Sequence, residues 1–496
     1  MSTPPPHLTV VERRLWEAFR RGERLDLDTG VAADDDPRVA GAWGAERTIR
    51  AHVLARLLLQ PPEPEPGHTL SLRLTGAMVT GPLELGGARL DMYVSLYRCR
   101  FDGPIVLNVA STGTVRAVEC VIPAVHARNL RVDGDLSFKA CAIPGGLRIL
   151  DARIDNDLRV DDCVVGPDDH DRAMFANGLH VGADASIDES VFTGQVNMFG
   201  ARFGGRATFY GTRIVRPGES ALNLSRVHVE HSLFLSQGFH AIGSIRMNDA
   251  RLGGAVVLAK ATVCADPDEM LAMWRVSANG LHLAPSVPPL GRIVLNNADL
   301  VTLTDAAGAW PPHGNLDIAG LTYTMWRSEG LKTVADRIDW VERGTPEYAP
   351  QPYDQLASVY RAVGEDDDAR AVLLAKQRRR RATLSVPGRV WGHVQDVAIG
   401  YGYRPARAFA WLVALVAVGT AVFAANRPSP LKPDEAPHWN PFWYTLDLLL
   451  PVITFGQDGA WKPTGPTQWF AYTLILLGWV LAGAAAAGAT RVLNRA

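Results

Sequence analysis

A ladder of small residues between positions 74 and 165 limits what this chain can fold into more than any other feature. Its rungs lie 21 or 22 residues apart along the sequence: Ala77, Cys99, Cys120, Cys141 and Cys163. A second ladder runs midway between these rungs, with gaps of 22 and 42 residues and therefore one missing rung: Ala88, Ala110 and Ala152. A repeat of about 11 residues, doubled to about 22, is typical of a solenoid that stacks one short turn of chain on the next.

Apolar residues follow each rung in a fixed order. Ala88-Leu90-Val94-Leu96 is followed by Cys99-Phe101-Ile105-Leu107 in the same register, and this alternation predicts short β-strands with one buried face. After an interruption at 166–178, steps of 11 residues return at Ser190, Ala201 and Thr212, and again at Ala250 and Ala261. We therefore predict a mainly β fold, a β-helix solenoid over residues 67–306 with about 22 residues per coil and about nine or ten coils.

The five cysteines raise the question of a zinc site or disulfides, but their spacing argues against both. Intervals of one coil place four of them at equivalent positions, about 4.8 Å apart from coil to coil. Zinc sites usually contain CxxC pairs, which this sequence lacks. We expect buried structural cysteines whose free thiols suit a reducing compartment. No metal or cofactor is predicted, and the weak candidates for a cation site lie in the acidic loop at 166–178: Asp168, Asp169, His170 and Asp171.

Three stretches of the predicted solenoid resemble the pentapeptide-repeat β-helices: TGAMVTGPLELGGARL, LDARIDNDLRV and LNNADLVTL. The rungs here recur every 11 residues instead of every five, so the strands should be longer than in that family. The whole layout is also similar to that of an actinobacterial group of membrane-attached proteins, in the segments WGAERTIR, QPYDQLA and LDLLLPVITFGQ. Members of that group are commonly labelled membrane-associated oxidoreductases, so the resemblance implies membrane attachment and a redox activity.

Other segments flank the predicted solenoid on both sides. Residues 1–66 should form a helical N-terminal cap, with helices at 8–22 and 43–60, because exposed solenoid ends are usually covered. Tyr323, Trp326 and Trp340 are spaced as a cap at the other end would be. The segments after the solenoid are a C-terminal cap or linker at 307–350, a helical hairpin at 351–385, a basic juxtamembrane segment at 386–405 and a membrane domain at 406–496.

Two apolar segments near the C-terminus, 406–425 and 469–489, are each about 20 residues long, which is enough to cross a bilayer. Few Lys or Arg residues lie between them, so the positive-inside rule places both termini and the solenoid in the cytoplasm of a bacterial cell. We expect a multi-pass protein of the cell membrane, with transmembrane helices that permit homo-oligomers. The basic residues expected to bind anionic lipids at the membrane surface are Arg378, Arg379, Arg380, Arg381, Arg404 and Arg407.

A shorter apolar stretch at 441–456 lies between these two segments and should be re-entrant or interfacial. Thr454-Phe455-Gly456 is similar to the start of the potassium-channel filter sequence TVGYG. Asp458 stands where that filter has its second glycine. Thr454, Gly456 and Asp458 are therefore candidates for a pore loop that departs from the potassium filter, and the alternative is an interfacial helix that closes the outer side.

Composition and motifs indicate function mainly by exclusion. The chain has 50 basic and 52 acidic residues, so we expect no nucleic-acid partner, and it lacks GxGxxG, GxSxG, Walker A and HExxH motifs. His228 and Glu230 should share one strand face, as surface residues of a sheet commonly do. We predict a membrane-tethered cytoplasmic scaffold or binding protein without a catalytic site and with an unidentified protein partner. The alternatives are an oligomeric two-span ion channel with a regulatory solenoid, and an oxidoreductase by family label only.

Overall fold

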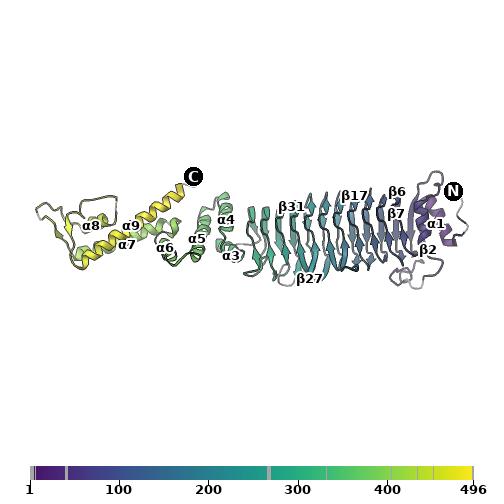
Figure 1. Cartoon of the computed structure of the whole chain (residues 1–496), viewed down its shortest axis with the longest axis horizontal. Helices are drawn as coiled ribbons and strands as arrows, with labels where there is room; N and C mark the ends of the chain where they lie inside the picture. Colours follow the sequence, from purple (N-terminus) through teal and green to yellow (C-terminus); the bar gives the residue numbers. More distant parts are fainter. Residues whose placement is uncertain are drawn as a thin grey trace. The chain divides into compact units, whose positions relative to one another are not determined.

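The computed structural model describes residues 5, 7–39, 43–264, 270–330, 332–403, 405–432, 434–450 and 452–493. The chain forms two compact units, 1–346 and 347–496. In the first unit, short parallel strands from successive turns of chain pair along one axis and form a β-solenoid (Figure 1). It has about 12 turns of about 22 residues. The predicted β-helix is therefore confirmed, with more turns than the nine or ten expected.

One representative coil shows how the repeat builds the solenoid. Strands β6 (Arg89–Leu90), β7 (Tyr93–Tyr97), β8 (Arg100–Phe101) and β9 (Ile105–Val106) follow one another along the chain. The next coil returns in parallel, so that β10 (Ser111–Thr112) pairs with β6 and β11 (Val115–Val118) pairs with β7. In β7, for example, buried residues alternate with partly exposed ones, and this alternation gives the apolar spacing seen in the sequence.

Three sheets line the solenoid. Besides β6, β7, β10 and β11, the largest contains β1 (Arg24–Asp26), β3 (Ser71–Thr75), β13 (Arg131–Val132), β14 (Leu136–Lys139), β17 (Arg153–Ile154), β18 (Leu158–Asp161), β21 (His180–Val181), β22 (Ala185–Ser186), β25 (Arg202–Phe203), β26 (Ala207–Thr208), β28 (His228–Val229), β29 (Leu233–Phe234), β31 (Arg251–Ala259), β34 (Ser277–Ala284), β36 (Asp299–Asp305) and β38 (Thr322–Ser328). Besides β9, the second contains β5 (Leu83–Glu84), β12 (Val125–His126), β15 (Ala142–Ile143), β16 (Leu147–Arg148), β19 (Val164–Val165), β20 (Arg172–Phe175), β23 (Val191–Thr193), β24 (Gln195–Asn197), β27 (Arg213–Asn223), β30 (His240–Arg246), β32 (Thr262–Cys264), β33 (Leu271–Ala272), β35 (Ile293–Val294) and β37 (Leu316–Asp317). The third joins β8 to β2 (Thr48–Arg50) and β4 (Met78–Thr80). Because β38 ends at Ser328, the coils continue past residue 306 into the segment expected as a C-terminal cap.

The predicted cysteine ladder lies inside the solenoid, with all four ladder cysteines buried and free. Each follows a residue in the left-handed conformation, as Ala140 (φ 52°) precedes Cys141, so the chain turns a corner just before the rung. The Cys141 thiol donates to the carbonyl oxygen of Ala117 in the preceding coil at 3.5 Å. Ser190 occupies the same position in a later coil and donates to Val160 at 2.8 Å. Most coils therefore have a small side chain at this rung, often one that can donate a hydrogen bond across coils, but buried Phe239 occupies it between Thr212 and Ala261.

Leu130 fills the missing rung of the second ladder and is fully buried. Its neighbour Arg131 pairs with Ser111 on one side and Arg153 on the other, which places Leu130 level with Ala110 and Ala152. This corner of the coil therefore also accepts a larger apolar side chain in place of alanine.

The N-terminal end of the solenoid is covered as predicted, with one difference. Helix α1 (Val10–Arg21) ends at Gly22 in the left-handed conformation (φ 64°). Helix α2 (Ala51–Leu59) begins later than the predicted residue 43, because residues 48–50 form β2 and pair with β4. Buried Glu12 on α1 forms an ion pair with Arg50 at 2.6 Å, which joins the two helices.

A buried carboxylate and an aromatic cluster close the other end of the first unit. The Asp305 carboxylate accepts hydrogen bonds from Trp310 Nε1 (2.7 Å) and Trp326 Nε1 (3.0 Å) and pairs with Lys332 at 2.5 Å. The ring of Trp340, on helix α3 (Val334–Arg343), lies 4.5 Å from the ring of Trp326. Of the three aromatic residues expected in a cap, Tyr323 and Trp326 thus belong to the last coil in β38, and Trp340 packs against both of them.

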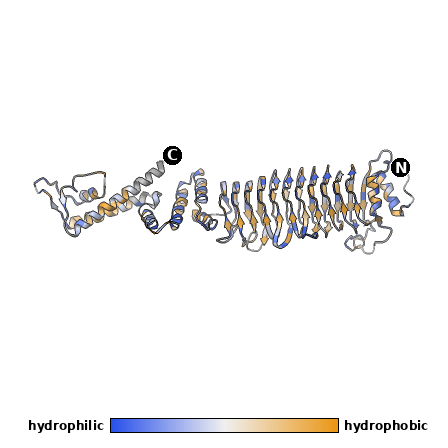
Figure 2. Cartoon of the chain, in the orientation of Figure 1, coloured by the Kyte–Doolittle hydropathy of each residue, from blue (hydrophilic) through white to orange (hydrophobic). Residues whose placement is uncertain are grey.

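The second unit is mainly helical, and its described part also contains one short antiparallel pair of strands, β39 (Ser429–Pro430) and β40 (Trp461–Lys462). Its helices are α4 (Gln351–Ala362), α5 (Asp366–Ala382), α6 (Val386–Ile399), α7 (Pro405–Ala425), α8 (Pro441–Leu449) and α9 (Pro466–Leu493). Helices α4 and α5 form the expected hairpin around Gly364. Hydrophobic residues follow α7 and α9 along much of their length (Figure 2).

The predicted membrane spans at 406–425 and 469–489 fall in α7 and α9. In the part of the chain that the structure describes, however, none of the helices is both long enough and apolar enough to cross a membrane. The structure therefore does not support these two spans. Helices α7, α8 and α9 share an apolar core that includes Phe423, Tyr444 and Leu474.

Candidate functional site

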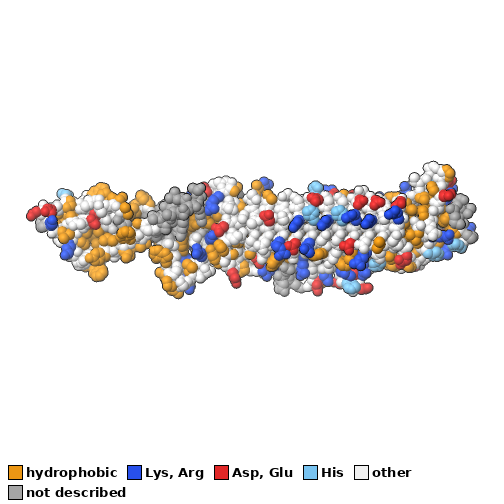
Figure 3. Space-filling model, turned by 45° about the horizontal axis from the view of Figure 1, so that its top comes forward, with side chains coloured by type: hydrophobic (Ala, Val, Ile, Leu, Met, Phe, Trp, Pro, Cys, Tyr) orange, Lys and Arg blue, Asp and Glu red, His pale blue; other side chains and the backbone are white. Residues whose placement is uncertain are grey.

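One outward-facing position of the solenoid carries a cationic side chain in coil after coil. Parallel pairing aligns Arg131 with Arg153, Arg153 with His180 and His180 with Arg202. The cation row consists of Arg89, Arg131, Arg153, His180, Arg202, His228 and Arg251. It runs along the solenoid as a line of blue and pale blue side chains (Figure 3). The row is broken once, where Ser111 occupies the position between Arg89 and Arg131.

A second row, of acidic side chains, lies beside the cation row (Figure 3). Its members follow the cationic residues by two positions along the chain, with one buried residue between them, as Val132 lies between Arg131 and Asp133. The acidic row consists of Asp91, Asp133, Asp155 and Glu230. The intervening coils have glycine at this position: Gly113, Gly182, Gly204 and Gly253.

Most of these charges lack partners among the described residues. There, no ion pair within 4.0 Å involves any member of the two rows except His228 and Glu230, whose side chains lie 3.0 Å apart. The prediction that these two residues share a strand face is confirmed by this contact. Like charges directly opposite each other in neighbouring strands cost roughly 0.2–1 kcal/mol per pair. The fold therefore keeps a repulsive arrangement over many coils, which is a feature of binding surfaces more than of stabilising ones.

A polar groove of about 620 Å³ lies beside the cation row. It lies between the first part of the cation row and the neighbouring corner of the coil, where Asn129, Asp151 and Gly178 turn the chain in the left-handed conformation. Both charge signs line it, since Asp151 faces the same groove as Arg131 and Arg153. The surface is therefore shaped by its two rows and is not a uniformly positive trough.

The acidic loop at 166–178 forms internal ion pairs. The buried Asp168 carboxylate lies 3.1 Å from both Arg148 and Arg172, and it accepts the backbone N–H of His170 at 2.8 Å. Burial alone would raise the pKa of Asp168, but the backbone amides of His170 and Arg172 and the two guanidinium groups lower it overall. Within the described ranges, no three His, Cys, Asp or Glu residues gather as metal ligands would.

The remaining members of this loop do not converge on Asp168. Asp171 pairs with Arg216 at 2.8 Å, and Asp169 and His170 are exposed. Of the four cation-site candidates, Asp168 and Asp171 thus contact three arginines between them, and Asp169 and His170 face solvent. The loop ties neighbouring coils together through β20, which pairs with β16 and β24.

In the second unit, the basic residues expected at the membrane surface lie on and near α5. Arg378 and Arg381 bond to the carboxylate of Asp396 on α6, at 3.0 and 3.2 Å. Arg407 donates to the backbone carbonyl of Asp396 at 3.4 Å. Arg404 lies outside the described residues. This arrangement joins α5 to α6, so part of the basic cluster holds helices together, whereas Arg380 is exposed.

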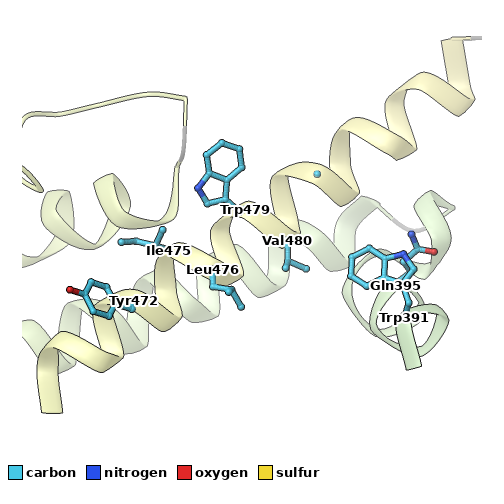
Figure 4. Close-up of a pocket in the computed structure, with 8 residues that line it drawn as sticks. Trp391, Gln395, Tyr472, Ile475, Leu476, Trp479 and Val480 are labelled. Atoms are coloured by element: carbon cyan, nitrogen blue, oxygen red, sulfur yellow. The ribbon is translucent and has the colours of Figure 1, made fainter. Parts of the chain in front are cut away.

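An apolar groove of about 740 Å³ lies between α6 and α9. Trp391 and Gln395 come from α6, while Tyr472, Leu476 and Trp479 come from α9 (Figure 4). A second apolar groove of about 400 Å³ is lined by other residues of α6, α7 and α9. Apolar grooves open to the surface accept hydrocarbon chains or apolar side chains.

The candidate pore loop wraps around one carboxylate. Asp447 on α8 accepts the backbone N–H groups of Phe455 (2.6 Å), Gln457 (2.7 Å) and Asp458 (2.9 Å). The amides of this turn therefore point toward Asp447, whereas a potassium filter presents backbone carbonyls to the ion. Thr454 and Gly456 are exposed, and Gly456 adopts a positive φ of 76°. This geometry is that of a capped turn.

Comparison of the chain with models of protein families, with curated proteins and with solved structures found no match.

Proposed function

We propose that this chain is a membrane-attached scaffold whose second unit inserts apolar side chains into lipid and whose solenoid displays its two charged rows to a partner. The observation that carries the proposal is the apolar surface of α7 and α9. Trp469 is 74 % exposed, Leu476 65 % and Trp479 62 %. Further exposed apolar side chains of this unit are Phe409, Trp411, Val413, Val418, Phe442, Trp443, Val452, Ile453, Phe455 and Tyr472. Contiguous apolar surface on this scale is typical of membrane or protein contacts.

Helix α6 has the pattern of a helix that lies in a membrane interface. Its exposed apolar side chains, Val386, Val390, Val394 and Val397, recur every three or four residues and so form one stripe. The neighbouring C-terminal part of α5 is rich in arginine. An apolar stripe beside basic residues favours binding to a membrane that contains anionic lipids.

Aromatic residues strengthen the case for lipid over a protein partner at this surface. Tryptophan and tyrosine side chains favour the boundary between headgroups and hydrocarbon, because their rings are apolar and their N–H or O–H groups can still reach water. Trp391, Trp411, Trp469, Tyr472 and Trp479 are all at least half-exposed or line the grooves of this unit.

Liposome flotation tests this function. The purified chain should float with vesicles that contain phosphatidylglycerol, and a triple variant, Trp469→Glu, Leu476→Glu and Trp479→Glu, should remain largely in the dense fraction. The matched control places the same three charges at exposed apolar residues of the solenoid, as Val109→Glu, Val164→Glu and Val301→Glu. If the wild-type chain stayed in the dense fraction, or if the triple variant floated as well as the control, membrane attachment through this surface would be wrong.

A further inference from the structure

The two rows on the solenoid are complementary to each other, and this complementarity defines a partner. We propose that the cation row and the acidic row form a self-complementary interface that pairs the solenoid side by side with a second copy of the same chain. The two copies run parallel and in register. The proposal rests on the solenoid rows alone and does not require the membrane attachment proposed above.

Symmetry fixes the orientation of the two copies. A two-fold axis that lies in the interface and runs parallel to the solenoid exchanges the rows across the interface while it keeps the order of the coils. The cation row of one copy then faces the acidic row of the other, twice over, as an isologous interface requires. A two-fold axis perpendicular to the solenoid would instead place arginine against arginine, so the antiparallel arrangement is disfavoured.

The repeat makes every rung match at once. Both copies have the same spacing of about 4.8 Å between coils, so alignment of one rung aligns all the others. Arg89, Arg131 and Arg153 of one copy would face Asp91, Asp133 and Asp155 of the second copy. In the described part of the chain none of these six side chains has an ion-pair partner of its own. The contact therefore breaks no existing ion pair at these three coils.

Glycine occupies the acidic position where carboxylates are absent. His180 and Arg202 lie level with Gly182 and Gly204, and Arg251 lies level with Gly253. The absence of a side chain leaves room for the long cationic side chain of the opposing copy. The solenoid face therefore combines coils that attract through charge with coils that leave space.

A linear polyanion is the competing occupant, and the acidic row argues against it. A phosphate or carboxylate polymer laid along the cation row would pass close to Asp91, Asp133 and Asp155, which would repel it at three coils. Single-stranded nucleic acid also favours aromatic platforms for its bases, and the residues that line the groove beside the cation row include none. A second copy instead presents the opposite charge at each of these coils.

Charge swaps test the interface in the full-length chain, purified in detergent and measured by light scattering with size-exclusion chromatography. Wild type should form dimers at low salt that dissociate at high salt, because exposed ion pairs are screened. Two variants reverse one row each, Arg131→Asp with Arg153→Asp, and Asp133→Arg with Asp155→Arg. Each variant alone should dimerise at least about tenfold more weakly than wild type, because like charges then face each other.

Mixing the two variants, and combining their substitutions in one chain, distinguishes this interface from misfolding and from polyanion binding. A mixture of the two variants should form heterodimers, since one copy then offers two acidic rows and the other two basic rows. A chain that carries all four substitutions should again form homodimers. Monomeric wild-type chain at every concentration, undiminished dimers of either single-row variant, or failure of the mixture to associate would each overturn the proposal.

Discussion

The buried carboxylate of Asp305 offers the sharpest test of how the last coil is held. Asp305 is fully buried, and its carboxylate accepts hydrogen bonds from four donors: Trp310 Nε1 at 2.7 Å, Trp326 Nε1 at 3.0 Å, Ser328 Oγ at 2.5 Å and Lys332 Nζ at 2.5 Å. The substitution Asp305→Asn keeps the size of the side chain but removes its charge. It also turns an NH₂ group toward groups that themselves donate hydrogen bonds.

The expected loss of stability follows from the Lys332 ammonium group, which loses its charged partner. Removal of one partner from a buried ion pair typically costs about 3–5 kcal/mol. The Lys332 side chain is 22 % exposed and can turn to water, so we expect the lower end, about 3 kcal/mol. Solenoid repeats contact mainly their neighbours, so this loss should open the terminal coil and α3 and leave the distant coils intact. A change of 3 kcal/mol corresponds to roughly a hundredfold faster local exchange.

Hydrogen exchange with mass spectrometry measures this local opening. Peptides within 316–343 should exchange roughly a hundredfold faster in Asp305→Asn, while peptides within 89–165 should not change. The matched control is Glu329→Gln, because Glu329 forms an exposed pair with His282 at 3.2 Å and such pairs contribute at most about 1 kcal/mol. Equal exchange of the two variants in 316–343 would refute the role assigned to the Asp305 carboxylate.

Acid should weaken the same end of the solenoid. Burial alone would raise the pKa of Asp305, but its bonds to Lys332, Ser328 and the two tryptophans lower the pKa overall. The stabilisation is therefore fully present above the ordinary value of 3.8 and is lost as pH falls through the lowered pKa of the folded state. The wild-type terminal coil should keep its protection at pH 5 and lose it only in stronger acid.

Three further predictions concern the first unit. Burial would raise the pKa of Glu12, but hydrogen bonds from Arg50 and the Thr9 amide lower it to about 2. Because the Arg50 side chain is partly exposed, Glu12→Gln should lower the free energy of unfolding in urea at pH 7 by about 2 kcal/mol. This difference from wild type should vanish as pH falls from 4.5 toward 2. Cys141→Ser should fold with nearly wild-type Tm because Ser190 occupies the equivalent rung. Cys141→Leu should lose about 1–3 kcal/mol of stability by overpacking. Equal Tm values for the two variants would contradict this account. Of the five thiols, only that of exposed Cys264 should react with Ellman's reagent in the native chain, and all five should react in guanidinium.

The repeat was the most predictable part of the fold because each coil repeats the same packing problem. Cys99, Cys120, Cys141 and Cys163 each sit at a corner with little space, and a small residue there can be recognised from sequence. Fewer coils were expected because the solenoid was taken to end at residue 306, whereas β38 extends it to Ser328. At the second corner a search for small residues also misses the buried rungs Leu130, Val276 and Leu321.

Tertiary pairing explains the main difference in the N-terminal cap. Residues 43–60 contain a helical apolar pattern, yet Thr48, Ile49 and Arg50 pair with Met78, Val79 and Thr80 of the first coil. Unpaired strand edges are costly, and a partner strand from the cap satisfies the first coil's backbone groups. Local sequence does not reveal this pairing, because the partner lies about 30 residues later.

The two charged rows were not predicted from the sequence, for a different reason. The nearly equal numbers of basic and acidic residues described the chain in bulk, whereas the rows depend on position within the coil. The signal was present in the residue that directly follows each rung of the second ladder, as in Ala88-Arg89, Ala152-Arg153, Ala201-Arg202 and Ala250-Arg251. An alignment of the charged residues by their position within the coil would have revealed the cation row.

The cation row covers only part of the solenoid, and this limits which coils of the two copies can pair. The cation row ends at Arg251, and the next three coils carry Ser277, Asp299 and Thr322 at the same position. A parallel pair would therefore join over the N-terminal coils and leave the last coils unpaired on this face. Both copies would also continue into their second units from the same end of the pair, as attachment to one membrane requires. Two copies held in one membrane have a raised effective concentration, so an interface of exposed ion pairs that is weak in dilute solution would suffice there.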